Sequence, residues 1–286
     1  MLNKKYYLET GVLREISSYL CSNFVQRFCY TSIHSLCELL TDLKNDKEYN
    51  IKKNVLKNIF ESNIDIKWCF PQNIILNSFG IENHYSIISK EEIVIINNIM
   101  QNSFDMNKFI HDVNLENSTI YEKICNYDLF YYKGFIDEKI RGYNEFRNIY
   151  GNAYNMKNIV WSIENDRNCL VFFINVTKMV LANNMSKDKI NINNINPCDL
   201  MKNYNGNLDM FIFAYAFYAL LEIPNNQNIG KNKRNDFNDI FHLTYINNKN
   251  DIFVIKDKIF EKLLNKKYQK NTISIENFKC KIKKML

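Results

Sequence analysis

The sequence predicts an α/β protein, in which helices cover both faces of a short, mostly parallel sheet and form a three-layer α/β/α sandwich. Two short apolar segments near the start, residues 5–8 and 28–31, have the length and composition of strands. Each is followed at once by apolar residues at helical spacing. A third apolar segment, residues 251–255, follows an amphipathic helical segment late in the chain. The chain holds only 7 glycines and 3 prolines, which favours helices over a turn-rich β protein.

Length and composition indicate a globular protein with a large core. At 286 residues the chain forms either one big domain or one domain that carries a long insertion. Apolar residues make up 46% of the chain and aromatic residues 14%, which argues against disorder. The net charge of +6 permits an anionic partner such as nucleic acid. A solvated surface with a small basic excess is the other interpretation, and the charge alone favours it.

We expect a soluble, cytoplasmic protein without a membrane partner. The eight cysteines show no CxxC spacing, and several lie in apolar helical patterns, as reduced thiols of cytosolic proteins do. Lys4, Lys5 and Glu9 interrupt any signal-peptide core at the start of the chain. Residues 210–221 are strongly apolar but too few to span a bilayer, so they predict a buried helix.

The first strand leads directly into Glu9, Thr10 and Gly11, and helical spacing follows over residues 12–24. An acid at the carboxyl end of a strand, before a glycine turn into a helix, is where α/β proteins place binding groups. The other interpretation of Glu9 is a surface carboxylate at a helix N-terminus, stabilised by the helix dipole. On this pattern alone the second interpretation is favoured, because helix starts collect acids.

The second strand leads into Ser32, a predicted N-cap, and then into a helix over residues 33–40. Glu38 lies in this helix among apolar neighbours. Its carboxylate either lies on the solvated face or is held in place by a cation or metal, because a buried charge needs a partner. The spacing leaves both interpretations open.

The middle of the chain is predicted to be mainly helical. Residues 54–63 continue the helical pattern, and residues 64–71 form an extended segment that ends at a proline. Residues 81–205 contain no metal-ligand spacing, phosphate-binding glycine loop or nucleophile elbow. We expect them to form a helical insertion or cap between two halves, residues 1–80 and 206–286, of one domain. The further predicted elements are a short one at 72–79, helices at 91–100, 104–113 and 120–140, and two helices within 158–181.

The C-terminal half carries acids at two places. A buried helix at residues 209–223 and a basic loop at 225–234 precede the stretch 234–257, which holds an amphipathic helix and a short strand. Carboxylates stand at the front of this stretch, Asp236 and Asp239, and at its end, Asp257. A helix that starts on an acid and a strand that ends on one can bring both carboxylates to one sheet edge. A further helix at 261–264 and a strand or turn near 273–278 complete the chain.

The order of these acids resembles that of the PIN-domain nucleases. That family begins with a strand, an Asp-Thr-Asn-like turn and an apolar helix, and Tyr-Leu-Glu-Thr-Gly-Val-Leu-Arg at residues 7–14 is similar to it. Its second acid is a Glu in the helix after the second strand, where Glu38 stands. Its third acid opens a late helix and its fourth follows a strand, and Asp239 and Asp257, 18 residues apart, stand in those places. The resemblance covers roughly residues 5–75 and 207–265.

Three positions depart from the pattern of the family. Residue 9 is Glu where Asp is usual, a side chain longer by one methylene. Residue 11 is Gly where Asn is common, and residue 255 is Ile where a Thr or Ser hydroxyl usually supports the site. Thr10 is retained. The departures leave the number of acids intact, and they support an alternative to a fully active enzyme.

The resemblance implies that Glu9, Glu38, Asp239 and Asp257 are the catalytic residues and hold a metal ion. Clustered carboxylates repel one another unless they are protonated or bridged by a cation, and oxygen ligands suit Mg²⁺ or Mn²⁺. Such an ion polarises a phosphodiester and generates hydroxide from bound water. The expected function is therefore a metal-dependent nuclease, a hydrolase that cuts RNA.

Other residues are expected to support this site. Asp236 is either a further metal ligand or, as capping preference favours, an N-cap or auxiliary residue. Thr10 and His242 are supporting residues, and a hydrogen bond from His242 to an acid is favoured over a role as catalytic base. Basic side chains near the site contact a phosphate backbone or belong to a solvated loop and strand end, with equal weight. These are Lys231, Lys233, Arg234, Lys256 and Lys258.

By the same resemblance, a bacterial toxin of a toxin-antitoxin pair or a defence nuclease is the expected biological setting. It allows an inhibitory partner protein and a homodimer beside the RNA substrate. The alternative function is a catalytically weak PIN-like protein that binds nucleic acid or a partner protein. A helical structural protein with coincidental acids is the third hypothesis.

Overall fold

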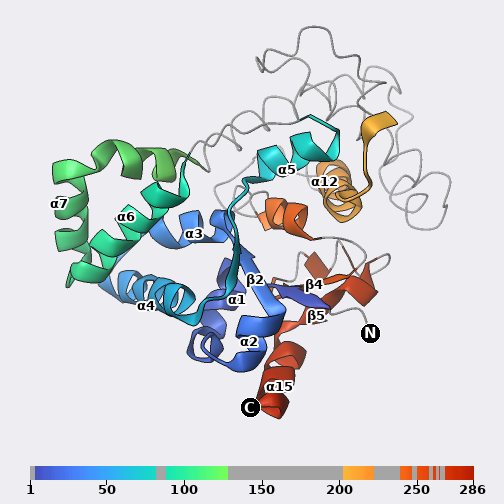
Figure 1. The fold of residues 1–286 in the computed structure, drawn as a ribbon, viewed down its shortest axis with the longest axis horizontal. Helices are drawn as coiled ribbons and strands as arrows, with labels where there is room; N and C mark the ends of the chain where they lie inside the picture. The colour runs from blue at the N-terminus through green and yellow to red at the C-terminus, as the bar shows by residue number, and fades with distance from the viewer. Residues whose placement is uncertain are drawn as a thin grey trace, which may run out of the picture.

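A computed structural model describes residues 4–81, 88–127, 202–221, 239–246, 250–257, 260–261, 264 and 268–286. The strands in this part of the chain form one five-stranded sheet in which all neighbours pair in parallel. The order across the sheet is β3-β2-β1-β4-β5, so the first strand lies at its centre (Figure 1). In chain order the strands are β1 (Lys5–Tyr7), β2 (Cys29–Ser32), β3 (Asp65–Lys67), β4 (Asp251–Ile255) and β5 (Thr272–Ser274).

Helices cover both faces of the sheet, so the predicted three-layer α/β fold is confirmed. Figure 1 shows α5 and α12 on one side of the strands and α1, α2 and α4 on the other. The first side is formed by α5 (Pro71–Ser78), α12 (Asp209–Leu221) and the 3-10 helix η3 (His242–Tyr245). The second side is formed by α1 (Thr10–Glu15), α2 (Asn23–Phe28), α3 (Ile33–Leu40), α4 (Asp46–Ser62) and α15 (Ile275–Met285).

Alternating side chains of the strands feed two separate hydrophobic cores. In β1, Tyr6 packs into the core beneath α1 to α4, whereas Tyr7 packs into the core beneath α5 and α12. In β4, Val254 and Phe253 divide in the same way. Successive residues of a strand point to opposite faces, so a strand with apolar residues at every position must be covered on both sides. This pattern gives the fold its three layers.

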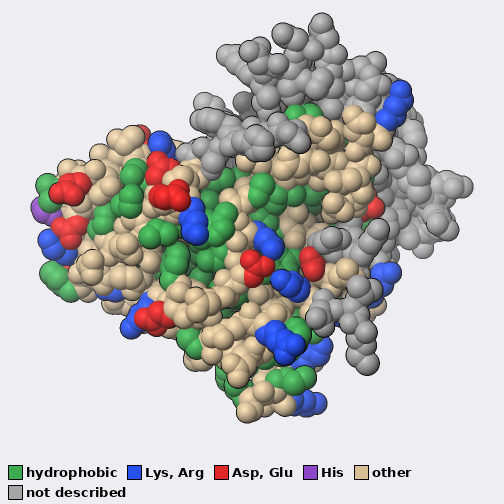
Figure 2. All heavy atoms as spheres, viewed as in Figure 1, with side chains coloured by type: hydrophobic (Ala, Val, Ile, Leu, Met, Phe, Trp, Pro, Cys, Tyr) green, Lys and Arg blue, Asp and Glu red, His purple; other side chains and the backbone are tan. Residues whose placement is uncertain are grey.

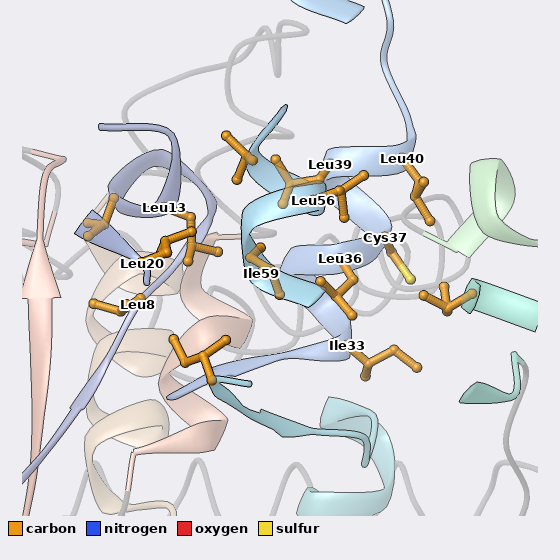
Figure 3. Close-up of a cluster of buried hydrophobic side chains, with 14 of the residues drawn as sticks. Leu8, Leu13, Leu20, Ile33, Leu36, Cys37, Leu39, Leu40, Leu56 and Ile59 are labelled. Carbon is orange, nitrogen blue, oxygen red and sulfur yellow. The ribbon is translucent and has the colours of Figure 1, made fainter. Parts of the chain in front are cut away.

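The first core is built largely from helix–helix contacts. Figure 3 shows leucine and isoleucine side chains of α3 and α4 gathered in one cluster, among them Leu36, Leu39, Leu56 and Ile59. These four side chains are at most 1% exposed. Each contributes on the order of 1.5–3 kcal/mol by burial, so α3 is held firmly against α4.

The described beginning of the predicted insertion packs into this same core. Helices α6 (Lys90–Asn102) and α7 (Met106–Glu116) and helical residues 118–127 bring Met100, Phe109 and Tyr127 into the cluster. The Tyr49 hydroxyl of α4 donates to the backbone carbonyl of Met100 at 2.9 Å. Residues 88–127 therefore extend the core of the N-terminal half.

The prediction of one continuous helix over residues 12–24 is wrong. Helix α1 ends at Glu15, a short 3-10 helix η1 (Ser17–Tyr19) follows, and α2 begins at Asn23. In this region, Ser17 and Ser22 form hydrogen bonds that do not belong to a continuous helix. The Asn58 amide donates to the carbonyl and hydroxyl of Ser17, and Ser22 caps α2 by accepting from the backbone of Val25. The Ser22 cap is a local bond that competes with helical ones, and the Asn58 bonds are tertiary contacts.

Other predicted elements are present with shifted bounds. The buried helix at residues 209–223 is α12, and the late apolar strand is β4. After β5, the chain continues as α15, a helix that the sequence prediction lacked. The predicted helices within 158–181 and the basic loop at 225–234 lie outside the described residues.

Two findings bear on the expected environment of the chain. Among the described helices, none is long and apolar enough to cross a bilayer. No disulfide bond joins the cysteines in the part of the chain that the structure describes, and Cys29 and Cys37 are buried.

A buried lysine closes the C-terminal end of α3. The Lys52 ammonium of α4 donates to the carbonyls of Glu38, Thr41 and Asp42 at 3.2, 2.6 and 3.4 Å. The last carbonyls of a helix lack intrahelical partners, and a cation at this end also complements the helix dipole. Burial lowers the pKa of Lys52. The lysine fixes the end of the helix that carries Glu38.

We expect Lys52→Met to lower the free energy of unfolding by about 2 kcal/mol, because three carbonyls lose a charged donor. Chemical denaturation of the purified chain measures this change. Lys57→Met is the matched control, because Lys57 lies on the same helix with an exposed side chain. It should change stability by less than about 0.5 kcal/mol. Equal losses in the two variants would contradict the capping role.

Candidate active site

The candidate site lies at the carboxyl edge of the central strands. In the sheet, Tyr7 of β1 pairs with Tyr30 of β2 on one side and with Phe253 of β4 on the other. Glu9 lies two residues after the end of β1, and Ser32 is the last residue of β2. Since parallel strands end at the same edge, residues from distant parts of the chain meet here.

Glu9 is the N-cap of α1. Its carboxylate accepts hydrogen bonds from the backbone N–H groups of Gly11 and Val12, the latter at 2.9 Å. The Glu9 side chain therefore caps a helix, and it is also partly buried at the sheet edge, where α/β proteins place binding groups. Burial raises the pKa of Glu9 to about 7, and the neighbouring carboxylate of Glu38 adds to the effect, whereas His242 and the two N–H groups oppose it.

Glu38 connects three segments of the chain through one carboxylate. Its Oε2 atom accepts from the hydroxyl of Thr10 and lies 3.1 Å from Nε2 of His242. Its Oε1 atom lies 3.7 Å from Nε2 of His34, one helical turn earlier on α3. The carboxylate is only 19% exposed. The Glu38 carboxylate is therefore mostly buried against the hydroxyl of Thr10 and the imidazoles of His34 and His242, and is not on a solvated face. Its binding of a metal ion stays a prediction.

The two carboxyl groups differ in their protonation. Burial alone would raise the pKa of Glu38, but the imidazoles of His242 and His34 and the hydrogen bonds from His242 and Thr10 outweigh it. They lower the pKa of Glu38 to about 2. Glu38 therefore stays ionised, while Glu9 exchanges its proton near neutral pH. Two carboxyl groups with separated pKa values can divide the roles of fixed anion and proton acceptor.

His242 is hydrogen-bonded to an acid, Glu38, and its supporting role in a site stays a prediction. The ring is only 1% exposed. Its Nε2 atom faces Glu38, and its Nδ1 atom lies 2.7 Å from the hydroxyl of Tyr7. The same hydroxyl lies 2.7 Å from Oγ of Ser32. Tyr7 and Ser32 thus fix the orientation of the His242 ring.

The sequence analysis missed His34 and the tyrosine behind it. His34 is 1% exposed, and its ring centroid lies 4.5 Å from that of His242, with the ring planes at 68°. Its Nδ1 atom lies 3.0 Å from the hydroxyl of Tyr127. The signal for His34 was present, because residues i and i+4 of a helix share a face, and His34 is placed so relative to Glu38. No local sequence pattern indicates Tyr127, which lies in the helical residues 118–127 after α7.

The four predicted acids do not all join this group. Within the described residues, the one set of metal-ligating side chains whose ligand atoms lie within 4.8 Å of one another is His34, Glu38 and His242. Asp239 is partly buried and precedes His242 by three residues on the same helical segment. Asp257 is exposed in the bend after β4. Their role as ligands stays a prediction, and Asp236 lies outside the described residues.

Of the five basic residues expected near a phosphate backbone, Lys256 is the one within the described residues. This lysine is exposed and pairs with Glu15 of α1 at 3.2 Å. On the face shown in Figure 2, basic and acidic side chains are interspersed, and several basic ones lie near α15. That helix carries Lys279, Lys281, Lys283 and Lys284. Lys231, Lys233, Arg234 and Lys258 lie outside the described residues.

The position of the Glu9 carboxylate is related to the absence of a side chain at Gly11. A Cβ atom on Gly11 would lie 3.0 and 3.1 Å from the two carboxylate oxygens of Glu9 and 3.2 Å from Cδ of Lys256. The longer side chain of Glu9 folds back onto the start of α1, and this requires the space that glycine leaves. Glycine at position 11 therefore leaves room for the folded-back carboxylate of Glu9.

A scan against protein-family models, a search of curated proteins and a search of solved structures each found no match.

We expect Gly11→Ala to destabilise the chain by about 1 kcal/mol, because the new methyl group displaces the Glu9 carboxylate from its N–H partners. In a chain with Glu9→Asp, the same Gly11→Ala change should cost less, since the shorter side chain leaves room. Denaturant unfolding of the four chains of this double-mutant cycle measures the coupling. Additive effects would mean that the two positions are independent.

The raised pKa of Glu9 predicts a pH-dependent stability. The folded chain binds this proton more tightly than the unfolded chain does, so the stabilisation is present at low pH and is lost as the pH rises through about 7. In chelator-treated buffer, wild type should lose roughly 1–3 kcal/mol relative to Glu9→Gln between pH 5 and pH 8. Urea unfolding at several pH values measures this difference. Parallel pH profiles would rule out the shift, and Glu61→Gln, at an exposed position of α4, serves as control.

Proposed function

We propose that the chain is a metal-dependent nuclease that hydrolyses phosphodiester bonds of RNA. The observation that supports this function best is the meeting of Glu9, Thr10, Glu38 and His242 at one edge of a parallel sheet. RNA as the substrate rests on the resemblance to PIN-domain nucleases.

The topology of the sheet supports a binding site at this place. From β1 the chain passes to β2 and β3 on one side, while β4 and β5 lie on the other side. Open α/β sheets bind ligands at the carboxyl ends of the strands where the strand order reverses. Glu9 follows β1 and Asp257 follows β4, so these two acids flank that position.

The PIN resemblance implies Mg²⁺ or Mn²⁺ as the ion, because both accept carboxylate ligands. The charge of Glu38 helps to raise the pKa of Glu9, so a cation between the two carboxylates would relieve their repulsion. Glu38 would hold the ion, together with Glu9, Asp239 and Asp257 as the PIN resemblance implies. A bound ion would polarise a phosphate and acidify a water molecule.

The protein groups have separate tasks in this proposal. Glu38 provides a permanent negative charge, which Thr10 and His242 orient. Without an ion, burial raises the pKa of Glu9 to about 7, and a bound cation would displace this proton and favour the ionised carboxylate. Tyr7 and Ser32 hold the ring of His242 in place.

A specific observation favours a second candidate, a PIN-like protein that binds RNA or a partner protein with little cleavage. Both oxygens of Glu9 accept backbone N–H groups of α1. Oε2 of Glu38 has two partners within the protein, Thr10 and His242. Oxygens with partners inside the protein compete less well for an ion.

The experiment compares cleavage of labelled single-stranded RNA by the purified chain with Mn²⁺, with Mg²⁺ and with a chelator. We expect cleavage that the chelator stops and Mn²⁺ restores. Glu38→Gln and the double variant Asp239→Asn, Asp257→Asn should each lower the rate about 100-fold or more, since even outer-shell partners of metal sites cost 10- to 100-fold.

Glu61→Gln is the matched control, because Glu61 is an exposed glutamate on α4. It should cleave at the wild-type rate. Equal rates in all variants, or no cleavage by wild type, would contradict the nuclease function. Retained RNA binding without cleavage would support the second candidate.

A further inference from the structure

We propose that His34, Glu38 and His242 form a binding site for a transition-metal ion of the zinc class, with two imidazole nitrogens and one carboxylate oxygen as ligands. This site shares Glu38 with the set of acids that the PIN resemblance implies, but its other two ligands are imidazoles. It does not rest on the proposed function, because it concerns binding of an ion in the absence of RNA.

Two of the distances between the ligand atoms are close to those around one small ion. Nε2 of His242 lies 3.1 Å from Oε2 of Glu38, and Nε2 of His34 lies 3.7 Å from Oε1. All three residues offer ligand atoms within 4.8 Å of one another. With metal–ligand bonds of 2.0–2.2 Å, the ligands of a tetrahedral ion stand about 3.3–3.5 Å apart. Small side-chain rotations therefore suffice to bring all three atoms to one ion.

Both imidazoles are oriented as metal ligands are. The Nε2 atom of each ring faces Glu38, and the Nδ1 atom of each lies at hydrogen-bond distance from a tyrosine hydroxyl. Tyr7 holds His242 at 2.7 Å, and Tyr127 holds His34 at 3.0 Å. In metal sites the second nitrogen of a ligating histidine donates to such a group, which fixes the tautomer and aims the first nitrogen at the ion. A buried histidine needs hydrogen-bond partners for its own ring only, whereas here two adjacent rings are oriented toward the same carboxylate.

The support of these ligands is rigid. His34 and Glu38 lie on one face of α3, whose end Lys52 closes. His242 belongs to η3, and Tyr7 belongs to the central strand. Both histidines are 1% exposed, whereas the Glu38 carboxylate is 19% exposed. The ion would thus be held from the interior and approached from the side of the carboxylate.

The donor set selects the class of ion. Two imidazoles and a carboxylate are a known ligand set of catalytic zinc, with a fourth position left for water or substrate. Among divalent first-row ions, a site of nitrogen and oxygen ligands binds Zn²⁺ far more tightly than Mn²⁺. Mg²⁺ and Ca²⁺, which prefer oxygen ligands, should bind weakly.

The test uses the full chain after removal of metals by a chelator. Zn²⁺ is titrated by calorimetry, and Co²⁺ serves as a spectroscopic probe through its visible absorption. We expect one Zn²⁺ per chain, a rise in the midpoint of thermal unfolding and an absorption spectrum of Co²⁺ with nitrogen and oxygen ligands. His34→Gln and Glu38→Gln should each weaken Zn²⁺ binding at least about 100-fold. Tyr127→Phe, which keeps its ring, should weaken it about 10-fold.

His111→Gln is the matched control, because His111 is an exposed histidine on α7 beside an acid, Asp112. It should bind Zn²⁺ as wild type does. All variants keep the eight cysteines, so ion bound by thiolates is the same in each. If His34→Gln fails to fold, Tyr127→Phe and the Co²⁺ spectrum of wild type decide. Zn²⁺ binding that is absent, or equal in wild type, His34→Gln and Tyr127→Phe, would overturn the proposal and leave the three residues as an ion-paired cluster.

Discussion

The arrangement of residues at the carboxyl edge of the sheet depends on the contacts of the Glu38 carboxylate. This carboxylate lies between Thr10 at the start of α1, His34 on its own helix and His242 more than two hundred residues later. A buried carboxylate without partners would cost several kcal/mol, so the chain must bring these groups together when it folds. The contact therefore joins the N-terminal and C-terminal halves of the sheet at the place where their strands meet.

The sequence was sufficient to predict the layered fold because the strands and helices carry local signals. Short apolar segments marked β2 and β4, helical spacing marked α3, and an uncharged, strongly apolar stretch marked α12. The break within residues 12–24 was not predicted, although Ser22, which caps α2, is a local signal for it. The bonds from Asn58, a side chain of another helix, to Ser17 have no local signal.

The candidate site was predictable in part for the same reason. The order of acids led to Glu9 and Glu38, and the spacing of residues led to His242 as a partner of an acid. His34 was not predicted, although it lies one helical turn before Glu38 on α3, because the four-acid pattern contains no histidine. Tyr7 and Tyr127 act through their hydroxyls at the second nitrogen of each ring. Only the folded arrangement relates such residues to the site.

The packing of residues 88–127 has a consequence for the modularity of the chain. Ile93, Met100 and Phe109 fill the core beneath α3 and α4, and Tyr127 contacts His34. A cut at residue 80 would separate these side chains from α3 and α4 and expose apolar surface on both fragments. The segment is therefore part of the packed core and not a detachable lid over it.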